Sequence, residues 1–139
     1  MQKGEFVNNI QGMMIEIPSF EEKKLDGGKN TVVFYKVVVG FSKNKKRWFL
    51  EKRYSDFDTL DKLIRDLYPN IAKLPGKTLF KVSDYKSIEE RRIIINNYMK
   101  SLINRRDMRT CEIFRKFLNF EKHHPVCQSF DTKKIAMMD

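Results

Sequence analysis

The sequence predicts an α+β fold, with a small antiparallel sheet in the first part of the chain and helices after it. Runs of β-branched and aromatic residues dominate residues 10–53. Farther along, apolar residues recur at steps of three and four, which is the period of an α-helix. The length of 139 residues, with 41% hydrophobic residues, suits one domain with a single core.

Three segments have the composition of β-strands. Residues 10–17 form a weak strand that Pro18 is expected to end. Residues 31–41 are rich in Val, Phe and Tyr, and residues 47–53 contain Trp48, Phe49 and Leu50. A short polar turn separates the two segments, which predicts a hairpin. The polar stretch 21–30 contains a Gly-Gly pair and is predicted to be a loop.

Beyond the strands, the pattern predicts three helices. The apolar face of the first consists of Phe57, Leu60, Leu63, Ile64, Leu67 and Tyr68. Ser55 is the predicted N-cap of this helix, and Pro69 is its predicted end. A second helix is predicted to begin at Ser87, with Glu90 at the capping-box position, and a third helix covers 110–118.

The net charge indicates the class of partner. The chain has 28 Lys and Arg against 18 Asp and Glu, a formal charge of +10. Residues 31–57 carry seven basic and two acidic side chains, and residues 87–106 carry five and two. A localised basic patch is therefore expected, and it favours a polyanion such as nucleic acid, an acidic membrane surface or a phosphorylated ligand.

The junction between the last strand and the first helix carries the first chemical signal. A helix N-terminus offers free backbone N–H groups and the positive end of the helix dipole, which suit phosphate. Arg53 directly precedes this helix and can grip phosphate with two N–H groups, and Tyr54 offers a flat apolar face for a ring. The alternative is structural: Arg53 would pair with a carboxylate, and Tyr54 would fill the core.

The helix after Ser87 carries a second signal. Arg91 falls inside its apolar stripe, and a charge on a buried face is costly unless it is paired. Arg91 therefore needs either an internal acid, such as Asp56 or Asp58, or an anionic ligand.

A third signal lies in the loop before this helix. Lys77 is followed by Leu79 and Phe80, and basic residues next to exposed apolar ones suit a membrane surface. The alternative is that Leu79 and Phe80 pack back onto the core.

Three motifs in register resemble the phox homology (PX) domain. They are Arg53-Tyr54-Ser55-Asp56-Phe57, Leu74-Pro75-Gly76-Lys77, and Ile88-Glu89-Glu90-Arg91-Arg92 followed by Tyr98-Met99. The resemblance covers about residues 8–123 and implies a three-stranded antiparallel β-sheet packed against a three- to four-helix bundle. It also implies binding of phosphoinositide headgroups, usually phosphatidylinositol 3-phosphate, on endosomal membranes, as in sorting nexins that serve protein transport.

The resemblance also implies a role for each headgroup-binding residue. Arg53 would bind the 3-phosphate, with help from Ser55, and Tyr54 would pack against the inositol ring. Lys77 would meet the 1-phosphate, and Arg91 would bind the 4- and 5-hydroxyls.

The same resemblance places Leu79 and Phe80 in a membrane-inserting loop. The chain departs from the family pattern at two points. Lys52 stands where the family often has the first arginine of a pair, which keeps the charge but loses the planar fork. Pro69 and Pro75 are six residues apart, so docking of a polyproline-reading domain is not expected.

The expected organisation is a lead-in over residues 1–7, a PX-like domain over 8–123 and a flexible tail over 124–139. No hydrophobic signal core is present, and the two cysteines, Cys111 and Cys127, are too few for a disulfide framework. We expect a monomeric cytoplasmic protein that binds endosomal or related vesicular membranes peripherally.

No enzyme is expected, because the sequence has no nucleophile elbow, no glycine loop for phosphate and no helix with paired metal ligands. The residues His123, His124, Cys111 and Cys127 fit no familiar zinc spacing. We therefore expect no catalytic residues, no metal and no cofactor.

Two other binding classes stay open. Trp48 and Phe49 lie among basic residues, a pattern found in nucleic-acid-binding sheets, but strand alternation turns some of them inward and no RNA-binding signature occurs. A PX-like module that binds a protein without lipid is the other alternative. The four residues Arg53, Tyr54, Lys77 and Arg91 argue against it.

Overall fold

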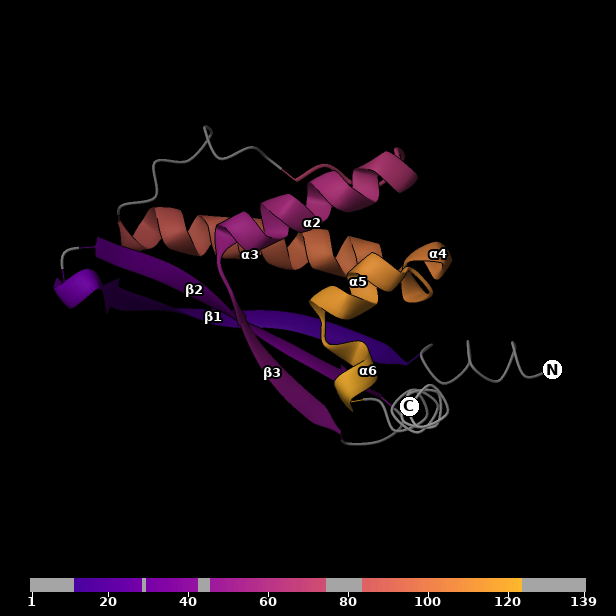
Figure 1. The fold of residues 1–139 in the computed structure, drawn as a ribbon, viewed down its shortest axis with the longest axis horizontal. Helices are drawn as coiled ribbons and strands as arrows, with labels where there is room; N and C mark the ends of the chain where they lie inside the picture. Colours follow the sequence, from indigo (N-terminus) through magenta and orange to yellow (C-terminus); the bar gives the residue numbers. More distant parts are fainter. Residues whose placement is uncertain (1–11, 29, 43–45, 75–83, 124–139) are drawn as a thin grey trace, which may run out of the picture.

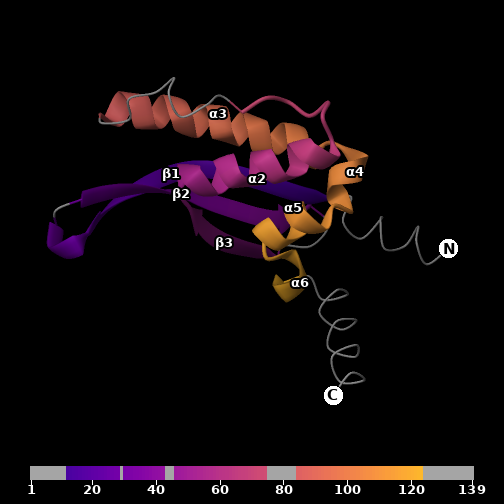
Figure 2. The same cartoon turned by 45° about the horizontal axis from the view of Figure 1, so that its top comes forward.

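The computed structural model describes residues 12–28, 30–42, 46–74 and 84–123. Its strands form one antiparallel sheet in the order β1-β2-β3, and Figures 1 and 2 show α2, α3 and α5 on one face of it. The strands are β1 (Met13–Leu25), β2 (Asn30–Phe41) and β3 (Arg47–Lys52). The helices are α2 (Tyr54–Leu67), α3 (Tyr85–Ile103), α4 (Arg106–Arg109), α5 (Glu112–Phe117) and α6 (Phe120–His123). This arrangement confirms the predicted α+β class.

The strand β1 is longer than the sequence pattern predicts. Its second half pairs with β2 as far as Leu25 opposite Asn30, so the predicted loop over residues 21–30 is wrong. Pro18 does not end the strand. The pairing of β1 with β2 shifts register between Glu16 and Ser19, so Pro18 lies in an irregularity of the ladder and pairing resumes after it. Proline is tolerated there because β1 is an edge strand, where a residue that lacks a backbone N–H need not break a hydrogen bond to a neighbouring strand. A short 3-10 turn, Asp26–Gly28, then reverses the chain, with both glycines at positive φ.

The core lies between the inner face of the sheet and the helices. Alternate strand residues point toward the helices and are buried, as in Ile15, Val37 and Val39. Helices α2, α3 and α5 contribute Phe57, Ile64, Ile95, Met99, Leu102 and Phe114. The predicted apolar face of the first helix is only partly buried, because Leu63 and Leu67 remain 49% and 60% exposed.

Both long helices begin earlier than the serine pattern predicts. The N-cap of α2 is Arg53, and the Asp56 carboxylate accepts a hydrogen bond from the Arg53 backbone N–H at 2.8 Å. The N-cap of α3 is Asp84, whose carboxylate accepts from the Ser87 N–H at 2.9 Å. The bond from Ser87 lowers the pKa of Asp84 below its usual range. An acidic residue competes with serine at such sites because its carboxylate is the stronger acceptor.

The predicted third helix over 110–118 is confirmed as α5, which is shorter than predicted at both ends, and the short helices α4 and α6 flank it. Asn119, at a positive φ of 54°, separates α5 from α6. The indole N–H of Trp48 donates to the Leu118 carbonyl at 2.8 Å, and the indole ring stacks on the ring of His123. These contacts hold residues 118–123 against β3.

No helix in the described ranges is long and apolar enough to cross a membrane. The expected lead-in 1–7 and tail 124–139 lie outside the described residues.

Candidate functional site

Two of the residues expected in a headgroup site, Tyr54 and Arg91, contact each other. Tyr54 is the first residue of α2, and Arg91 lies on the sheet-facing side of α3. The guanidinium carbon of Arg91 lies 4.0 Å from the centroid of the Tyr54 ring. The fold therefore brings together residues that are far apart in the sequence, because both helices pack on one face of the sheet.

Arg91 is a buried cation with aromatic neighbours. Its exposed fraction is 8%, and the Tyr54 ring beneath it is 6% exposed. Burial raises the pKa of the nearby Tyr35 hydroxyl to about 12, and the positive charge of Arg91 opposes this rise. Burial likewise raises the pKa of Tyr54, again against the charge of Arg91. The guanidinium of an arginine stacked on a ring can still donate hydrogen bonds in its own plane.

The acids expected as alternative partners of Arg91 have interactions elsewhere. Asp56 accepts the Arg53 backbone N–H, and Asp58 forms an ion pair with Lys62 at 3.0 Å. Asp61 is a buried acid on α2 that binds Tyr98 and Arg65, and it is not among the candidate residues named from the sequence. Helical periodicity could have indicated it, since Asp61 follows Phe57 by four residues and so lies on the same buried face.

Arg53 has an exposed side chain at the N-cap of α2, directly before Tyr54. Within the part of the chain that the structure describes, no acidic side chain forms an ion pair with it. Ser55 is the second residue of α2 and is half-buried. Arg53, Tyr54 and Ser55 thus form the start of α2, where the helix dipole is positive.

Three further expected site residues, Lys77, Leu79 and Phe80, lie outside the described residues. The segment that contains them begins after the buried Leu74 and ends before Asp84, the N-cap of α3.

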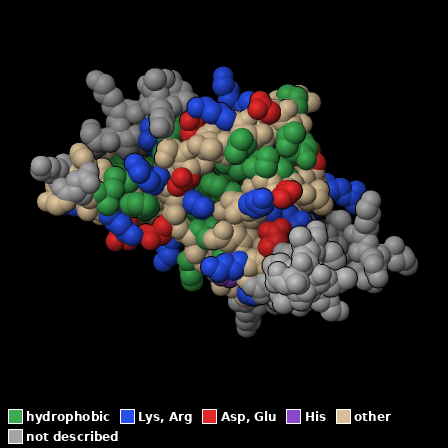
Figure 3. Space-filling view, in the orientation of Figure 1, with side chains coloured by type: hydrophobic (Ala, Val, Ile, Leu, Met, Phe, Trp, Pro, Cys, Tyr) green, Lys and Arg blue, Asp and Glu red, His purple; other side chains and the backbone are tan. Residues whose placement is uncertain are grey.

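Basic groups are dispersed over the surface that Figure 3 shows, where acidic groups lie between them. On this face they do not form the localised patch that the sequence predicts. Several basic groups are matched internally, including Arg65 with Asp61 at 2.7 Å and Arg105 with Asp107 at 2.8 Å. No cluster of three or more His, Cys, Asp or Glu side chains that could hold a metal ion occurs among the described residues.

Comparison with known families decides which family this fold represents. A family model described as the PX domain matches residues 41–121. The chain belongs to the PX domain family. Membership supports a phosphoinositide-binding module that associates peripherally with membranes.

Curated relatives resemble this PX domain over limited segments. The kinase Sgk3 of Rattus norvegicus is 30% identical over 109 residues, which is 77% of this chain but 21% of the kinase. A probable serine/threonine-protein kinase of Dictyostelium discoideum is 34% identical over 60% of this chain and 4% of its own length. Human sorting nexin-16 is 28% identical over 60% of this chain and 25% of its length. This chain thus spans a quarter or less of these relatives, and the matches carry no kinase activity over to it.

Solved PX domains share the fold. A designed CISK-PX domain superposes with a TM-score of 0.67 at 27% identity, covering 75% of this chain and 96% of that one. The mouse SNX19 PX domain, solved with a bound sulphate ion, superposes at 0.56 and 18% identity over 77% of this chain and 96% of that one. The three-stranded sheet with its helices is therefore the PX architecture.

Proposed function

We propose that this PX domain, over residues 8–123, binds phosphatidylinositol 3-phosphate and so recruits the chain to endosomal membranes for protein sorting or trafficking. One observation carries the proposal: Arg91 is held on the ring of Tyr54, the residue that directly follows the exposed Arg53. A guanidinium stacked on a ring can donate hydrogen bonds in its own plane to sugar hydroxyls, and an exposed one at a helix N-terminus is suited to phosphate.

Each residue of this group has a proposed role. Arg53 binds the 3-phosphate with both arms of its guanidinium, and Ser55 assists from the first turn of α2. Arg91 donates to the 4- and 5-hydroxyls from its place over Tyr54, and the inositol ring packs at the rim of the tyrosine.

The segment 75–83 supplies the remaining proposed contacts. Lys77 meets the 1-phosphate, and Leu79 and Phe80 enter the lipid. Micromolar binding needs about 8 kcal/mol, whereas each basic residue near an acidic leaflet supplies about 1 kcal/mol. Specific headgroup contacts and apolar insertion must therefore act together.

The test is flotation of the 139-residue protein with phosphatidylcholine vesicles that contain phosphatidylinositol 3-phosphate. Arg53→Ala removes a charge-assisted bidentate contact, so we expect binding to fall at least about tenfold. Thermal unfolding should be unchanged, because the Arg53 side chain is exposed. Arg106→Ala is the matched control, since Arg106 is also an exposed arginine but lies on α4.

Unchanged flotation of the Arg53→Ala protein would reject the headgroup site. The lipid preference is tested with vesicles that differ only in the phosphoinositide. Equal binding to all species would reject selectivity for the 3-phosphate while leaving membrane association intact.

Nucleic-acid binding through the sheet has less support. Trp48 is buried and donates to the Leu118 carbonyl, so its ring cannot stack on a base, and Phe49 alone of this pair is exposed.

A further inference from the structure

The outer edge of β1 has two differently protected parts. In an antiparallel ladder, alternate residues of an edge strand direct both backbone groups away from the neighbouring strand. The Gly12 carbonyl accepts a hydrogen bond from the Ser42 N–H at 2.8 Å, so the backbone groups of Gly12 point toward β2. By alternation, the backbone N–H and C=O groups of Met13, Ile15 and Ile17 point away from β2, toward the outer edge of the sheet.

α3 protects only the last of these three residues. The Ile17 N–H donates to the Asn96 side chain at 2.8 Å, and the Ile17 carbonyl accepts from Arg92 at 2.7 Å. Among the groups that the structure describes, none bonds the outward N–H and C=O of Met13 and Ile15. A strand edge left in this state is a template for another strand.

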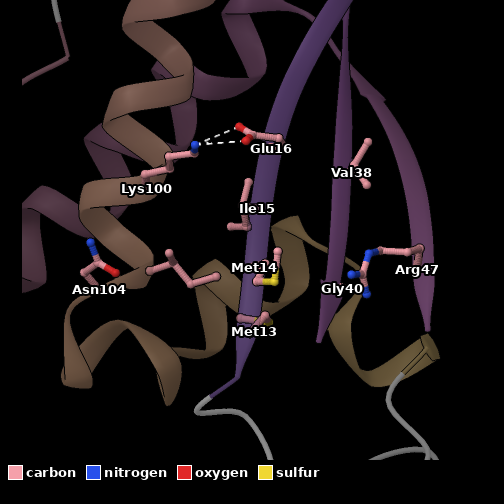
Figure 4. A pocket seen from close by; sticks show the side chains of 10 residues that line it. Met13, Met14, Ile15, Glu16, Val38, Gly40, Arg47, Lys100 and Asn104 are labelled. Atoms are coloured by element: carbon pink, nitrogen blue, oxygen red, sulfur yellow. Dashed lines mark hydrogen bonds and ion pairs between the residues drawn. The ribbon is translucent and has the colours of Figure 1, made fainter. Parts of the chain in front are cut away.

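A groove runs along this same part of β1. Its volume is about 410 Å³, within the range of ligand pockets. Its apolar lining includes Met14, Val38 and Ile103. Figure 4 shows Lys100 and Asn104 on the α3 side of β1, and Val38 and Arg47 on the other side. The groove therefore has one apolar residue on each side of β1, Ile103 of α3 and Val38 of β2.

The rim of the groove is basic. Lys100 forms an ion pair with Glu16 at 2.9 Å. Arg47 donates to the Phe41 and Lys46 carbonyls, and no carboxylate among the described residues forms an ion pair with it. Two cations against one acid favour a partner with acidic residues.

We propose that an extended peptide segment of another protein, with alternating apolar side chains and acidic flanks, adds to the sheet as a fourth strand beside Met13–Ile15. Backbone bonds to Met13 and Ile15 supply affinity, and the groove selects the apolar residues. This site is distinct from the headgroup site, because Arg91 and Lys100 are nine residues apart on α3, about 13 Å along the helix.

The probe is the synthetic peptide Glu-Asp-Val-Thr-Val-Thr-Val-Asp-Glu, titrated into the 139-residue protein by fluorescence anisotropy. Two derivatives carry N-methyl groups, one on its valines and one on its threonines. Only one row of peptide amides can face β1, so we expect one derivative to bind about tenfold more weakly and the other to bind like the parent. Hydrogen exchange should show new protection at the Met13 and Ile15 amides.

Protein variants test the basic rim. Lys100→Glu should weaken peptide binding, whereas Lys62→Glu should not, although both lysines lie on helices and pair with an acid at about 3 Å. Liposome flotation should be alike in these two variants, which separates this proposal from the headgroup site. No binding by the peptide, equal effects of the two methylated forms, or self-association of the protein through this edge would overturn the proposal.

Discussion

Asp61 is a buried carboxylate that joins α2 to α3. The Tyr98 hydroxyl donates to it at 2.5 Å, and the Arg65 guanidinium donates to the same oxygen at 2.7 Å. Burial raises the pKa of Tyr98, and the hydrogen bond to Asp61 raises it further, so the hydroxyl stays protonated and remains a donor. A buried carboxylate needs such donors, because an unsatisfied one costs more than a hydrogen bond gains.

Tyr98→Phe removes one of these donors and leaves the ring in place. We expect the free energy of unfolding to fall by about 1–3 kcal/mol, since among the described residues Arg65 is then the side chain left to bind Asp61. Urea unfolding measures the change. Tyr85→Phe is the control, because the Tyr85 side chain is 72% exposed and its hydroxyl lies in water. Equal losses in the two variants would mean that the bond to Asp61 contributes nothing specific.

Arg91 shows what helical spacing can predict about a single residue. Its place in the apolar stripe of α3 follows from the sequence, and the structure confirms that it is buried. Its contact with the Tyr54 ring depends on how α2 and α3 are arranged on the sheet, which no local pattern specifies. Tyr35, whose hydroxyl lies near Arg91, was missed for the same reason.

The short helix α6 packs against β3 through an aromatic pair. The rings of Trp48 and His123 are stacked, with centroids 4.9 Å apart and planes 12° apart. Burial lowers the pKa of His123, and the positive charges of Lys46 and Lys122 lower it further. The packed arrangement therefore favours the neutral imidazole.

The protein should become less stable as the pH falls. Below a pH of about 6.5 the unfolded chain binds a proton at His123 more readily than the folded chain does, so the stabilisation is complete above that pH and declines below it. Thermal unfolding between pH 7.5 and about 5, followed by the fluorescence of Trp48, measures this slope. His123→Phe keeps an aromatic ring but cannot titrate, and its slope should be shallower. Identical slopes would exclude His123 as the source.

Element types were more predictable from the sequence than element ends. The strands β2 and β3 and the helices α2 and α3 follow from periods of two and 3.6 residues, which come from backbone geometry. The extension of β1 past Pro18 does not, because it depends on a partner strand long enough to pair with it. The two N-caps were misplaced at serines, since Asp56 and Asp84 provide the acceptors instead.

The charge of the whole molecule bears on membrane binding separately from the headgroup site. The chain carries a net charge of +10, and on the face that Figure 3 shows basic groups are interleaved with acidic ones. A dispersed charge attracts an acidic surface without selecting a headgroup, and salt screens this attraction.

Salt should therefore weaken vesicle binding in proportion to the acidic lipid present. With phosphatidylserine in the vesicles, raising the salt from about 0.1 to about 1 M shortens the Debye length from about 10 to about 3 Å, and we expect at least about tenfold weaker binding. With phosphatidylcholine and phosphatidylinositol 3-phosphate alone, the loss should be smaller. Sedimentation measures both series. Equal salt dependence in both would show that diffuse charge plays no part.

The sequence by itself determined the α+β class, the helical face that buries Arg91, and the basic character of the chain. It could do so because periodicity and composition are local properties. Only the tertiary structure decided that Arg91 lies on Tyr54, that Asp61 holds Tyr98, and that α3 protects the edge of β1 at Ile17 but not at Met13 or Ile15. Each of these contacts joins residues far apart in the chain, so it depends on how the elements pack.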